Sequence, residues 1–232
     1  NAILCEVKEK WNMEISYESY SDIDIIETYC TMTSILGNDF IPHLLTIELK
    51  TDGIDKLISA TKISIEQHGL LIYNGKINYN TLKSIFKYLS TTEDNDIHYV
   101  CEKYINKRIM GDAKLPSDCY ALKNKDSLSH YIYNNPGNWH KEYYKQIFNT
   151  NITLDSTDMF NACNNYIKGI YWVYSYYKGA DIDCEWFYPY NYPPTLKDLT
   201  NHSIAYEEPI INSNNNFVSP NMQLLIVLPK ES

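Results

Sequence analysis

Hydrophobic positions recur along this chain mainly at helical spacing. Ile25, Tyr29, Met32 and Leu36 fall three or four residues apart, which predicts a helix over 22–36. That helix should end at Gly37, because glycine tolerates the positive φ found just past a helix C-terminus. The same spacing predicts further helices over about 54–63, 80–89 (which Asn80 can cap), 97–108 and 158–177.

Other segments do not follow this helical pattern. Residues 69–75 form a short apolar run between glycines, which predicts a strand or a turn. The prolines of 186–194 require an extended path, since each lacks a backbone donor and would clash within a helix. Residues 110–126 are predicted to be a surface loop or linker. Met222–Leu228 is short and apolar, hence expected to be buried, as either helix or strand. The fold class is therefore mainly α, with short strands and extended, aromatic and proline-rich segments.

Composition narrows the class of protein. The chain has 232 residues, 44% of them apolar and 21% charged, which indicates a globular chain of one large or two small domains. Its net charge of −9 argues against binding nucleic acid through bulk positive charge, although a local groove stays open. No apolar stretch is long enough to span a membrane, so no membrane partner is expected.

Cysteine usage bears on the compartment. The six cysteines are far apart and form no C-x-x-C pair, so the sequence predicts neither a zinc site nor a disulfide framework. We therefore expect a reducing, intracellular location, and the sequence does not distinguish cytoplasm from nucleus.

The segment Leu36–Leu44, L-G-N-D-F-I-P-H-L, carries the clearest candidate chemistry. Asp39 stands where a helix has just ended and Pro42 restrains the backbone, so its carboxylate can project into a cleft. Such a carboxylate suits a hard divalent cation. On these residues alone a cap or turn role for Asp39 is the stronger reading. His43 lacks a neighbour at ligand spacing, which favours a hydrogen-bonded packing role.

Aromatic rings on an extended backbone characterise the segment 186–194, W-F-Y-P-Y-N-Y-P-P. Single-stranded nucleic acid is held by stacking on such rings. Packing of each ring onto the core is the competing and more common role.

The chain carries four informative segments: L-G-N-D-F-I-P-H-L (Leu36–Leu44), W-H-K-E-Y-Y followed by Phe148, the stretch from Tyr166 to Leu199, and Q-L-L-I-V-L-P (223–229). In this order they resemble the XRN family of 5'-to-3' exoribonucleases. L-G-N-D-F-I-P-H-L with Gly53-Ile54-Asp55 resembles the block that closes the catalytic region. Residues 139–148 are similar to the element W-x-x-x-Y-Y-x-x-x-F. The stretch from Tyr166 to Leu199 resembles Y-I-x-G-L-x-W-V-x-x-Y-Y-x-x-G ahead of W-x-Y-P-Y-H-Y-A-P-x-x-x-D-L, and 223–229 matches Q-L-L-A-V-L-P. Together the four segments cover nearly the whole chain.

This resemblance implies a processive nuclease that depends on Mg²⁺ or Mn²⁺ and degrades RNA from a 5'-monophosphorylated end. The position that matches a metal ligand of the family is Asp39, which would be both a catalytic and a metal-binding residue. Two-metal chemistry needs several carboxylates, and the family's other ligands lie in an α/β nuclease core that precedes this block. The resemblance therefore implies that the remaining ligands lie outside this chain.

The chain opens at Asn1 in ordinary domain sequence, so we expect a fragment. Residues 1–45 would be the end of the nuclease catalytic region, and 46–232 the XRN-type helical domain. The expected partners are single-stranded RNA with a 5'-monophosphate and the missing N-terminal nuclease half. Alone, the fragment should be inactive.

Departures from the family pattern concern the aromatic segment. Asn191 stands where the family has His, and Cys184 stands where many members have a further Trp. If a tryptophan stacks on a base, that role passes to Trp186 or is missing. Two other interpretations stay open. One is a non-catalytic RNA-binding or assembly module, and the other is an aromatic-rich helical domain of a different purpose.

Overall fold

The computed structural model describes residues 2–11, 20–49, 52–106, 121–122, 126–148, 157–205 and 220–228. The described chain is mainly helical, as predicted. Its helices are α1 (Ala2–Lys10), α2 (Asp22–Ser34), α3 (Gly53–His68), α4 (Tyr79–Ser90), α5 (Glu93–Ile105), α6 (Ser127–Asn134), α7 (Trp139–Ile147), α8 (Thr157–Lys178), α9 (Leu196–His202) and α10 (Pro220–Val227). The strands β1 (Ile72–Tyr73) and β2 (Lys76–Ile77) pair in an antiparallel hairpin.

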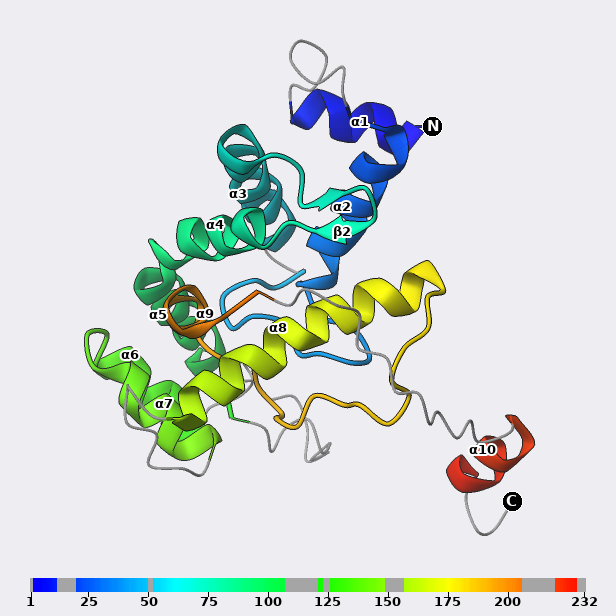
Figure 1. Ribbon diagram of the computed structural model, residues 1–232. Coiled ribbons are helices and arrows are strands. Elements are labelled where there is room, and N and C mark those ends of the chain that lie inside the picture. Colours follow the sequence, from blue (N-terminus) through cyan, green and yellow to red (C-terminus); the bar gives the residue numbers. More distant parts are fainter. Residues whose placement is uncertain are drawn as a thin grey trace.

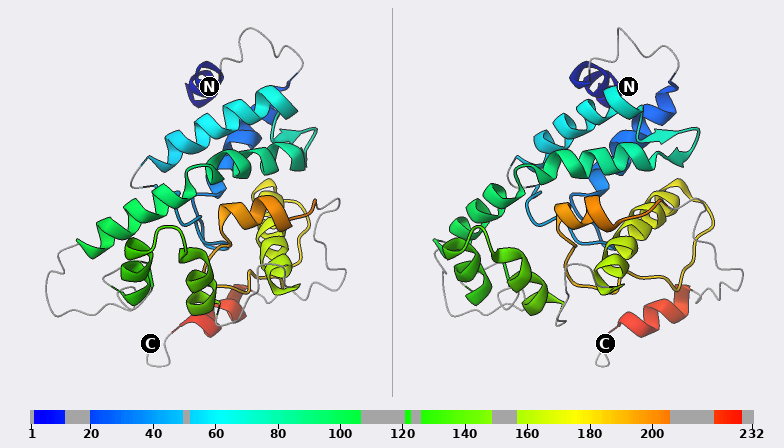
Figure 2. Two further views of the ribbon diagram at one scale, coloured as in Figure 1. Left: turned by 90° about the vertical axis from the view of Figure 1, so that its left-hand side faces the viewer. Right: turned by 60° about the vertical axis from the view of Figure 1, so that its left-hand side comes forward.

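Helix α8, the longest of the described helices, contacts α2 and α9 (Figure 1). Helices α3 and α4 run side by side and α5 follows α4, while α6 packs on both α5 and α7 (Figure 2). The short helix α9 lies between α4 and α8 and contacts both. One continuous apolar cluster joins these elements, with Met32, Leu44, Phe86, Tyr166 and Leu199 among its fully buried members.

Helix boundaries mostly agree with the hydrophobic pattern. Helix α2 begins at its predicted residue, where Ser21 caps it by accepting a hydrogen bond from the Asp24 N–H, and α8 spans the predicted 158–177 with one more residue at each end. The helix predicted over 97–108 begins earlier, at Glu93, and ends at Ile105. The N-cap of α4 is Asn78 rather than Asn80, because its side-chain oxygen accepts from the N–H groups of Asn80 and Thr81.

Apart from 222–228, the segments without helical periodicity agree with their predictions where the structure describes them. Residues 186–194 contain neither helix nor strand, as their prolines predict. Residues 69–75 form a turn and a strand. The predicted loop 110–126 lies largely outside the described residues. The described residues contain no helix that is long and apolar enough to cross a membrane.

The prediction of burial for Met222–Leu228 is wrong. This segment forms α10, and its described apolar side chains are exposed, with Leu225 68% and Ile226 69% accessible. Figure 1 shows α10 apart from the packed helices. An apolar run is buried only when another part of the protein packs over it. A short run does not show which part that is, or whether it belongs to the same chain.

Buried polar side chains join α7 to the segment that leads into α9. Asp198, 4% accessible, accepts hydrogen bonds at Oδ2 from Tyr144 Oη at 2.6 Å and Thr195 Oγ1 at 2.6 Å, and its Oδ2 lies 2.7 Å from Nε2 of His140. Burial alone would raise the pKa of Asp198, but these hydrogen bonds outweigh it and hold the pKa below its usual value. Tyr143 extends the junction by donating to the Pro193 carbonyl oxygen at 2.7 Å.

A second buried carboxylate, Glu93 of α5, caps the start of α9. Its two oxygens accept from the backbone N–H groups of Leu196 at 2.6 Å and Lys197 at 3.1 Å. Because Glu93 is only 1% accessible, burial outweighs these two bonds and raises its pKa to about 7. Next to it, Asp94 accepts from Trp139 Nε1 at 2.9 Å and pairs with Lys197 Nζ at 2.6 Å. Helices α5, α7 and α9 are thus joined through two neighbouring residues of α5, the buried Glu93 and the exposed Asp94.

The raised pKa of Glu93 predicts a pH-dependent contribution to stability. The pKa of Glu93 rises from 4.5 to about 7 on folding. Between these two pH values, the folded state keeps a proton on Glu93 that the unfolded state has released. This contribution is therefore fully present below about pH 4.5 and is lost as pH rises through about 7, with a magnitude of about 3 kcal/mol. Urea unfolding across this pH range should show a flatter pH dependence in Glu93→Gln than in the wild type.

An exposed carboxyl on α3 supplies the control. Glu66→Gln should keep the wild-type pH dependence, because Glu66 lies at the surface. Parallel profiles for the wild type and Glu93→Gln would contradict the assignment of this proton to Glu93.

Candidate functional site

Asp39 lies at the tip of a tight turn that follows α2. The turn begins at Gly37, whose φ of 98° is in the left-handed region and whose Cβ, if present, would meet the His43 backbone nitrogen at 2.9 Å. Asn38 then organises the turn, since its Oδ1 accepts from the N–H groups of Phe40 at 2.9 Å and Ile41 at 3.1 Å. The backbone N–H of Asn38 closes the turn by donating to the Ile41 carbonyl oxygen at 3.2 Å. Glycine and asparagine therefore set the backbone on which Asp39 stands.

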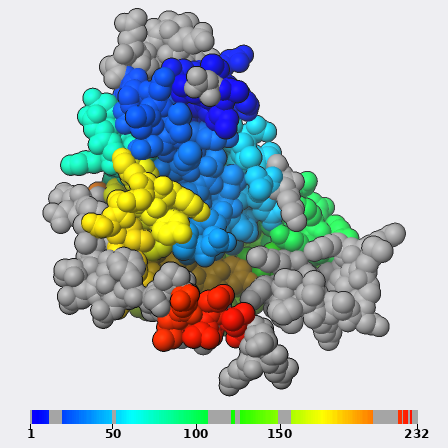
Figure 3. All heavy atoms as spheres, turned by 90° about the vertical axis from the view of Figure 1, so that its right-hand side faces the viewer, coloured from blue at the N-terminus to red at the C-terminus, as the bar shows by residue number. Residues whose placement is uncertain are grey.

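The turn is attached to one face of α8. Residues 166, 169, 172 and 176 are spaced by three or four positions, which places them on the same side of that helix. Tyr166 donates from its hydroxyl to the Pro42 carbonyl oxygen at 2.9 Å. The Phe40 ring contacts the rings of Trp172 and Tyr176, each with centroids 4.8 Å apart. Figure 3 shows α2 and the turn beside the end of α8.

Gly169 permits the closest approach between the turn and α8. A Cβ at this position would lie 2.6 Å from Ile41 Cγ2 and 3.0 Å from Cη2 of Trp186. Both distances are shorter than ordinary van der Waals contact, so only a hydrogen atom fits. The glycine within Y-I-K-G-I therefore has a packing role that joins the turn, α8 and the aromatic segment at one point.

The Asp39 carboxylate is exposed, and the described residues give it no hydrogen bond or ion pair. Its oxygens are the donor type that Mg²⁺ and Mn²⁺ prefer, so Asp39 fits as one ligand of such an ion. Within the described ranges, no group of three or more His, Cys, Asp or Glu side chains could hold a metal ion. Asp39 can therefore contribute to a metal site but cannot form one with the described residues.

Trp186 is half-buried rather than freely exposed. Its ring packs on Trp172, with centroids 5.6 Å apart, and over Gly169. Trp172 is fixed in turn by donating from Nε1 to the Asp183 carbonyl oxygen at 2.7 Å. The neighbouring Phe187 is 73% accessible, a larger exposed aromatic surface than sequence reasoning singled out. No sequence signal separates the two rings, because both lie on the same extended segment.

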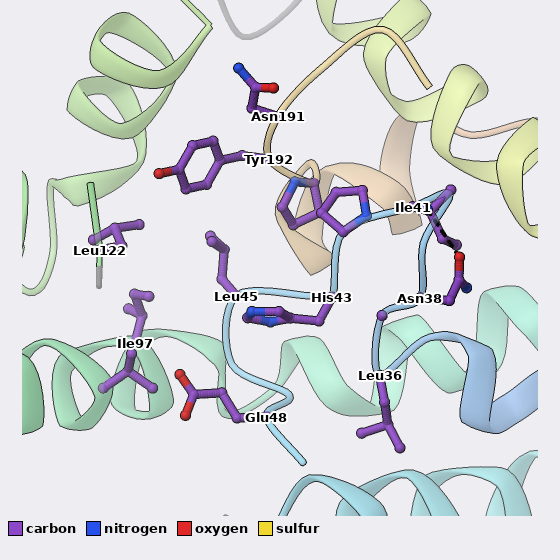
Figure 4. Close-up of a pocket in the computed structure, with 14 residues that line it drawn as sticks. Leu36, Asn38, Ile41, His43, Leu45, Glu48, Ile97, Leu122, Asn191 and Tyr192 are labelled. Carbon is purple, nitrogen blue, oxygen red and sulfur yellow. Dashed lines mark hydrogen bonds between the residues drawn. The ribbon is translucent and has the colours of Figure 1, made fainter. Parts of the chain in front are cut away.

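A pocket of about 520 Å³ opens on the other side of the turn (Figure 4). Its walls come from the turn, from α5 and from residues 191–193, and they include His43, Glu48, Asn191 and Tyr192. Nδ1 of His43 lies 2.9 Å from the Leu44 carbonyl oxygen, so the prediction of a hydrogen-bonded packing histidine is confirmed. Glu48 accepts from Tyr104 Oη at 2.5 Å, which engages its carboxylate within the fold.

A second pocket, of about 480 Å³, lies between α2 and α8. Its charged members are Glu27 and Lys178, which form an ion pair at 3.3 Å, and Tyr174 donates to Glu27 at 2.6 Å. Burial raises the pKa of Tyr174, with the hydrogen bond to Glu27 adding to it, to about 12. Tyr174 is therefore a neutral donor near pH 7, and this trio connects α2 to α8 rather than offering a reactive group.

The close approach at Gly169 predicts that a single added methyl group destabilises the fold. In Gly169→Ala the gain in helix propensity, about 1 kcal/mol, is opposed by overpacking against Ile41 and Trp186, which costs about 1–3 kcal/mol. We expect a net loss, measured as a lower urea midpoint with an unchanged slope. Gly137→Ala, where the new Cβ would meet nothing within 4 Å, should change the free energy of unfolding by no more than about 0.5 kcal/mol. A midpoint raised in Gly169→Ala would contradict the close packing.

Comparison with known proteins places these motifs in a family. Residues 19–109 and 123–232 match the family model described as Xrn1 helical domain. The chain is similar to human 5'-3' exoribonuclease 1, with 26% identity over 90% of this chain and 14% of the human protein. It is also similar to the 5'-3' exoribonuclease 2 homolog of Drosophila melanogaster, with 21% identity over 78% of this chain and 25% of that protein.

A third relative is 5'-3' exoribonuclease 2 of Schizosaccharomyces pombe, with 32% identity over 51% of this chain and 11% of that protein. The chain thus spans a quarter or less of the length of these relatives. The four motifs, the helical architecture and the family match agree, and the chain belongs to the family defined by the Xrn1 helical domain.

Proposed function

We propose that this chain is part of a divalent-metal-dependent 5'-to-3' exoribonuclease that degrades RNA carrying a 5'-monophosphate. The relatives named above are 5'-3' exoribonucleases, and the chain covers only a small part of each. In this proposal residues 1–45 end the nuclease region and 46–232 form the helical domain. The observation that carries the proposal is the exposed Asp39 carboxylate, which has no partner among the described residues and stands on a turn fixed from several sides.

Asp39 would supply one oxygen ligand to Mg²⁺ or Mn²⁺, and the remaining ligands would come from a nuclease core outside this chain. When bound, such ions activate a water and stabilise the leaving oxygen of the phosphodiester. Gly37 and Asn38 hold the backbone of the turn, so the carboxylate meets the ion without first ordering a loop. Trp186 is proposed to stack on a base of the single strand.

Apolar surface on the described part of the chain supports a packing partner such as the nuclease half. Helix α10 exposes Leu224, Leu225 and Ile226. An apolar pocket of about 440 Å³ also opens between α1 and α2, where Ile3 and Ile26 are exposed. Surface of this kind commonly marks a protein interface. The fragment alone would then lack both the remaining ligands and the surface that completes the site, and we propose that it is inactive.

Loss of the Asp39 carboxylate should abolish catalysis without unfolding the protein. In the complete protein, Asp39→Ala should reduce Mg²⁺-dependent degradation of 5'-monophosphorylated RNA by at least about 100-fold, as removal of one group that stabilises transition-state charge does elsewhere. Thermal unfolding should be nearly unchanged, since the side chain is exposed. Glu66→Ala, which removes an exposed carboxylate from α3, is the matched control. Wild-type degradation by Asp39→Ala would refute the metal role.

The alternative, a non-catalytic RNA-binding or assembly module, is distinguished by a chelator. We expect the 232-residue chain to bind single-stranded RNA weakly, because its net charge is −9. Binding can be measured by fluorescence anisotropy with a labelled RNA, with and without EDTA. Tight binding that EDTA does not change would favour the module over the nuclease.

A further inference from the structure

Phe40, the residue next to Asp39, has its ring in contact with two rings of α8. Its centroid lies 4.8 Å from that of Trp172 and 4.8 Å from that of Tyr176, at an interplanar angle of 59° in both cases. Trp172 and Tyr176 are themselves stacked, with centroids 5.4 Å apart and planes 9° from parallel. Phe40 thus packs against a parallel pair of rings, at centroid distances within the range of favourable aromatic contacts. We call these three residues the Phe40 clamp.

One side of the clamp is fixed by the fold. Trp172 is 5% accessible, its indole N–H is bonded to the Asp183 carbonyl oxygen, and Trp186 packs on its ring. The other side, Tyr176, is 46% accessible. Truncation of the Tyr176 side chain to alanine therefore removes one of the two rings that contact Phe40, without opening a cavity in the core.

The clamp fixes Phe40, the residue that follows Asp39 in the chain. Asn38 holds the backbone N–H groups of Phe40 and Ile41, whereas the Asp39 side chain has no hydrogen bond or ion pair with the described residues. The position of its Cα–Cβ bond, from which the carboxylate extends, therefore follows the backbone at 39–40, which the Phe40 side chain anchors to α8. A ligand displaced by even 1 Å is a poor ligand for Mg²⁺, which demands near-octahedral geometry.

We propose that Trp172 and Tyr176 are positioning residues for the metal site, acting through Phe40 to aim the Asp39 carboxylate. This inference rests on the proposed metal role of Asp39. In this proposal the aromatic pair of the W-V-x-x-Y-Y segment positions a metal ligand, in addition to packing in the fold. The half-exposed ring of Tyr176 would then raise the affinity for the ion through Phe40, while contributing little to the buried core.

The test uses the complete protein and three variants. Tyr176→Ala removes the exposed ring, Tyr176→Phe keeps the ring without its hydroxyl, and Tyr99→Ala removes a ring of similar exposure, 62%, from α5. Titration with MnCl₂ in a calorimeter measures ion affinity in the absence of RNA. We expect Tyr176→Ala to bind Mn²⁺ about tenfold more weakly, equivalent to about 1.4 kcal/mol. Tyr176→Phe and Tyr99→Ala should match the wild type.

Amide hydrogen exchange provides a second readout that needs neither metal nor activity. The N–H groups of Phe40 and Ile41 donate to Asn38, and their exchange should be several-fold faster in Tyr176→Ala than in Tyr176→Phe. Phe40→Leu, which keeps apolar bulk but removes the ring contacts, should show the same weaker Mn²⁺ affinity as Tyr176→Ala. Thermal unfolding of each variant confirms that the fold is retained.

Failure of the clamp and failure of the metal role give different results. If Asp39→Ala leaves Mn²⁺ affinity unchanged, the metal assignment of Asp39 is refuted, and the clamp proposal falls with it. If Asp39→Ala loses affinity while Tyr176→Ala and Phe40→Leu keep it, only the clamp is refuted. If all three lose affinity and Tyr176→Phe keeps it, the clamp is supported.

Discussion

The packing of one face of α8 against the turn 37–43 is the constraint on which the candidate site depends. Tyr166, Gly169, Trp172 and Tyr176 lie along that face, and they hold the turn by a hydrogen bond, a close approach and two ring contacts. The turn is separated from these residues by more than a hundred positions of sequence. A long helix therefore serves as a rigid support for a short loop, because backbone fixed on a regular element keeps its position more accurately than backbone in a free loop.

A second junction holds the other helices in place. Asp198 and Glu93 are buried, and their oxygens accept hydrogen bonds from within the fold. Asp198 accepts from Tyr144 and Thr195, and Glu93 accepts from the N–H groups at the start of α9. Their burial would be costly without these partners. The contrast with Asp39 is informative, since Asp39 is exposed and has no described partner. The chain thus uses these two buried carboxyl groups to join helices, whereas the Asp39 carboxylate stays exposed on its turn.

Much of the fold could be predicted because helical periodicity is local. The spacing in α2 and α8, the glycine at 37 beyond the end of α2, and the prolines of 186–194 all act within a few residues. Predictions that depend on distant partners fared worse. One local prediction was also wrong, since the N-cap of α4 is Asn78 and not Asn80: the side-chain oxygen of Asn78 reaches the free N–H groups. The burial expected at 222–228 depended on a covering partner that an apolar run does not specify. The position of Asp39 on a turn was predictable from L-G-N-D-F-I-P, but its support by Trp172 and Tyr176 was not, since periodicity does not show which distant helix a ring meets.

Helix α10 has a practical consequence for work on this chain in isolation. Its leucines and isoleucine face water, and apolar helices of this kind bind one another as protein concentration rises. Purified alone, the chain would therefore associate through α10 at the concentrations used for crystallisation or NMR. A polar replacement at Leu225 or Ile226 would make the remaining helices easier to study as a monomer.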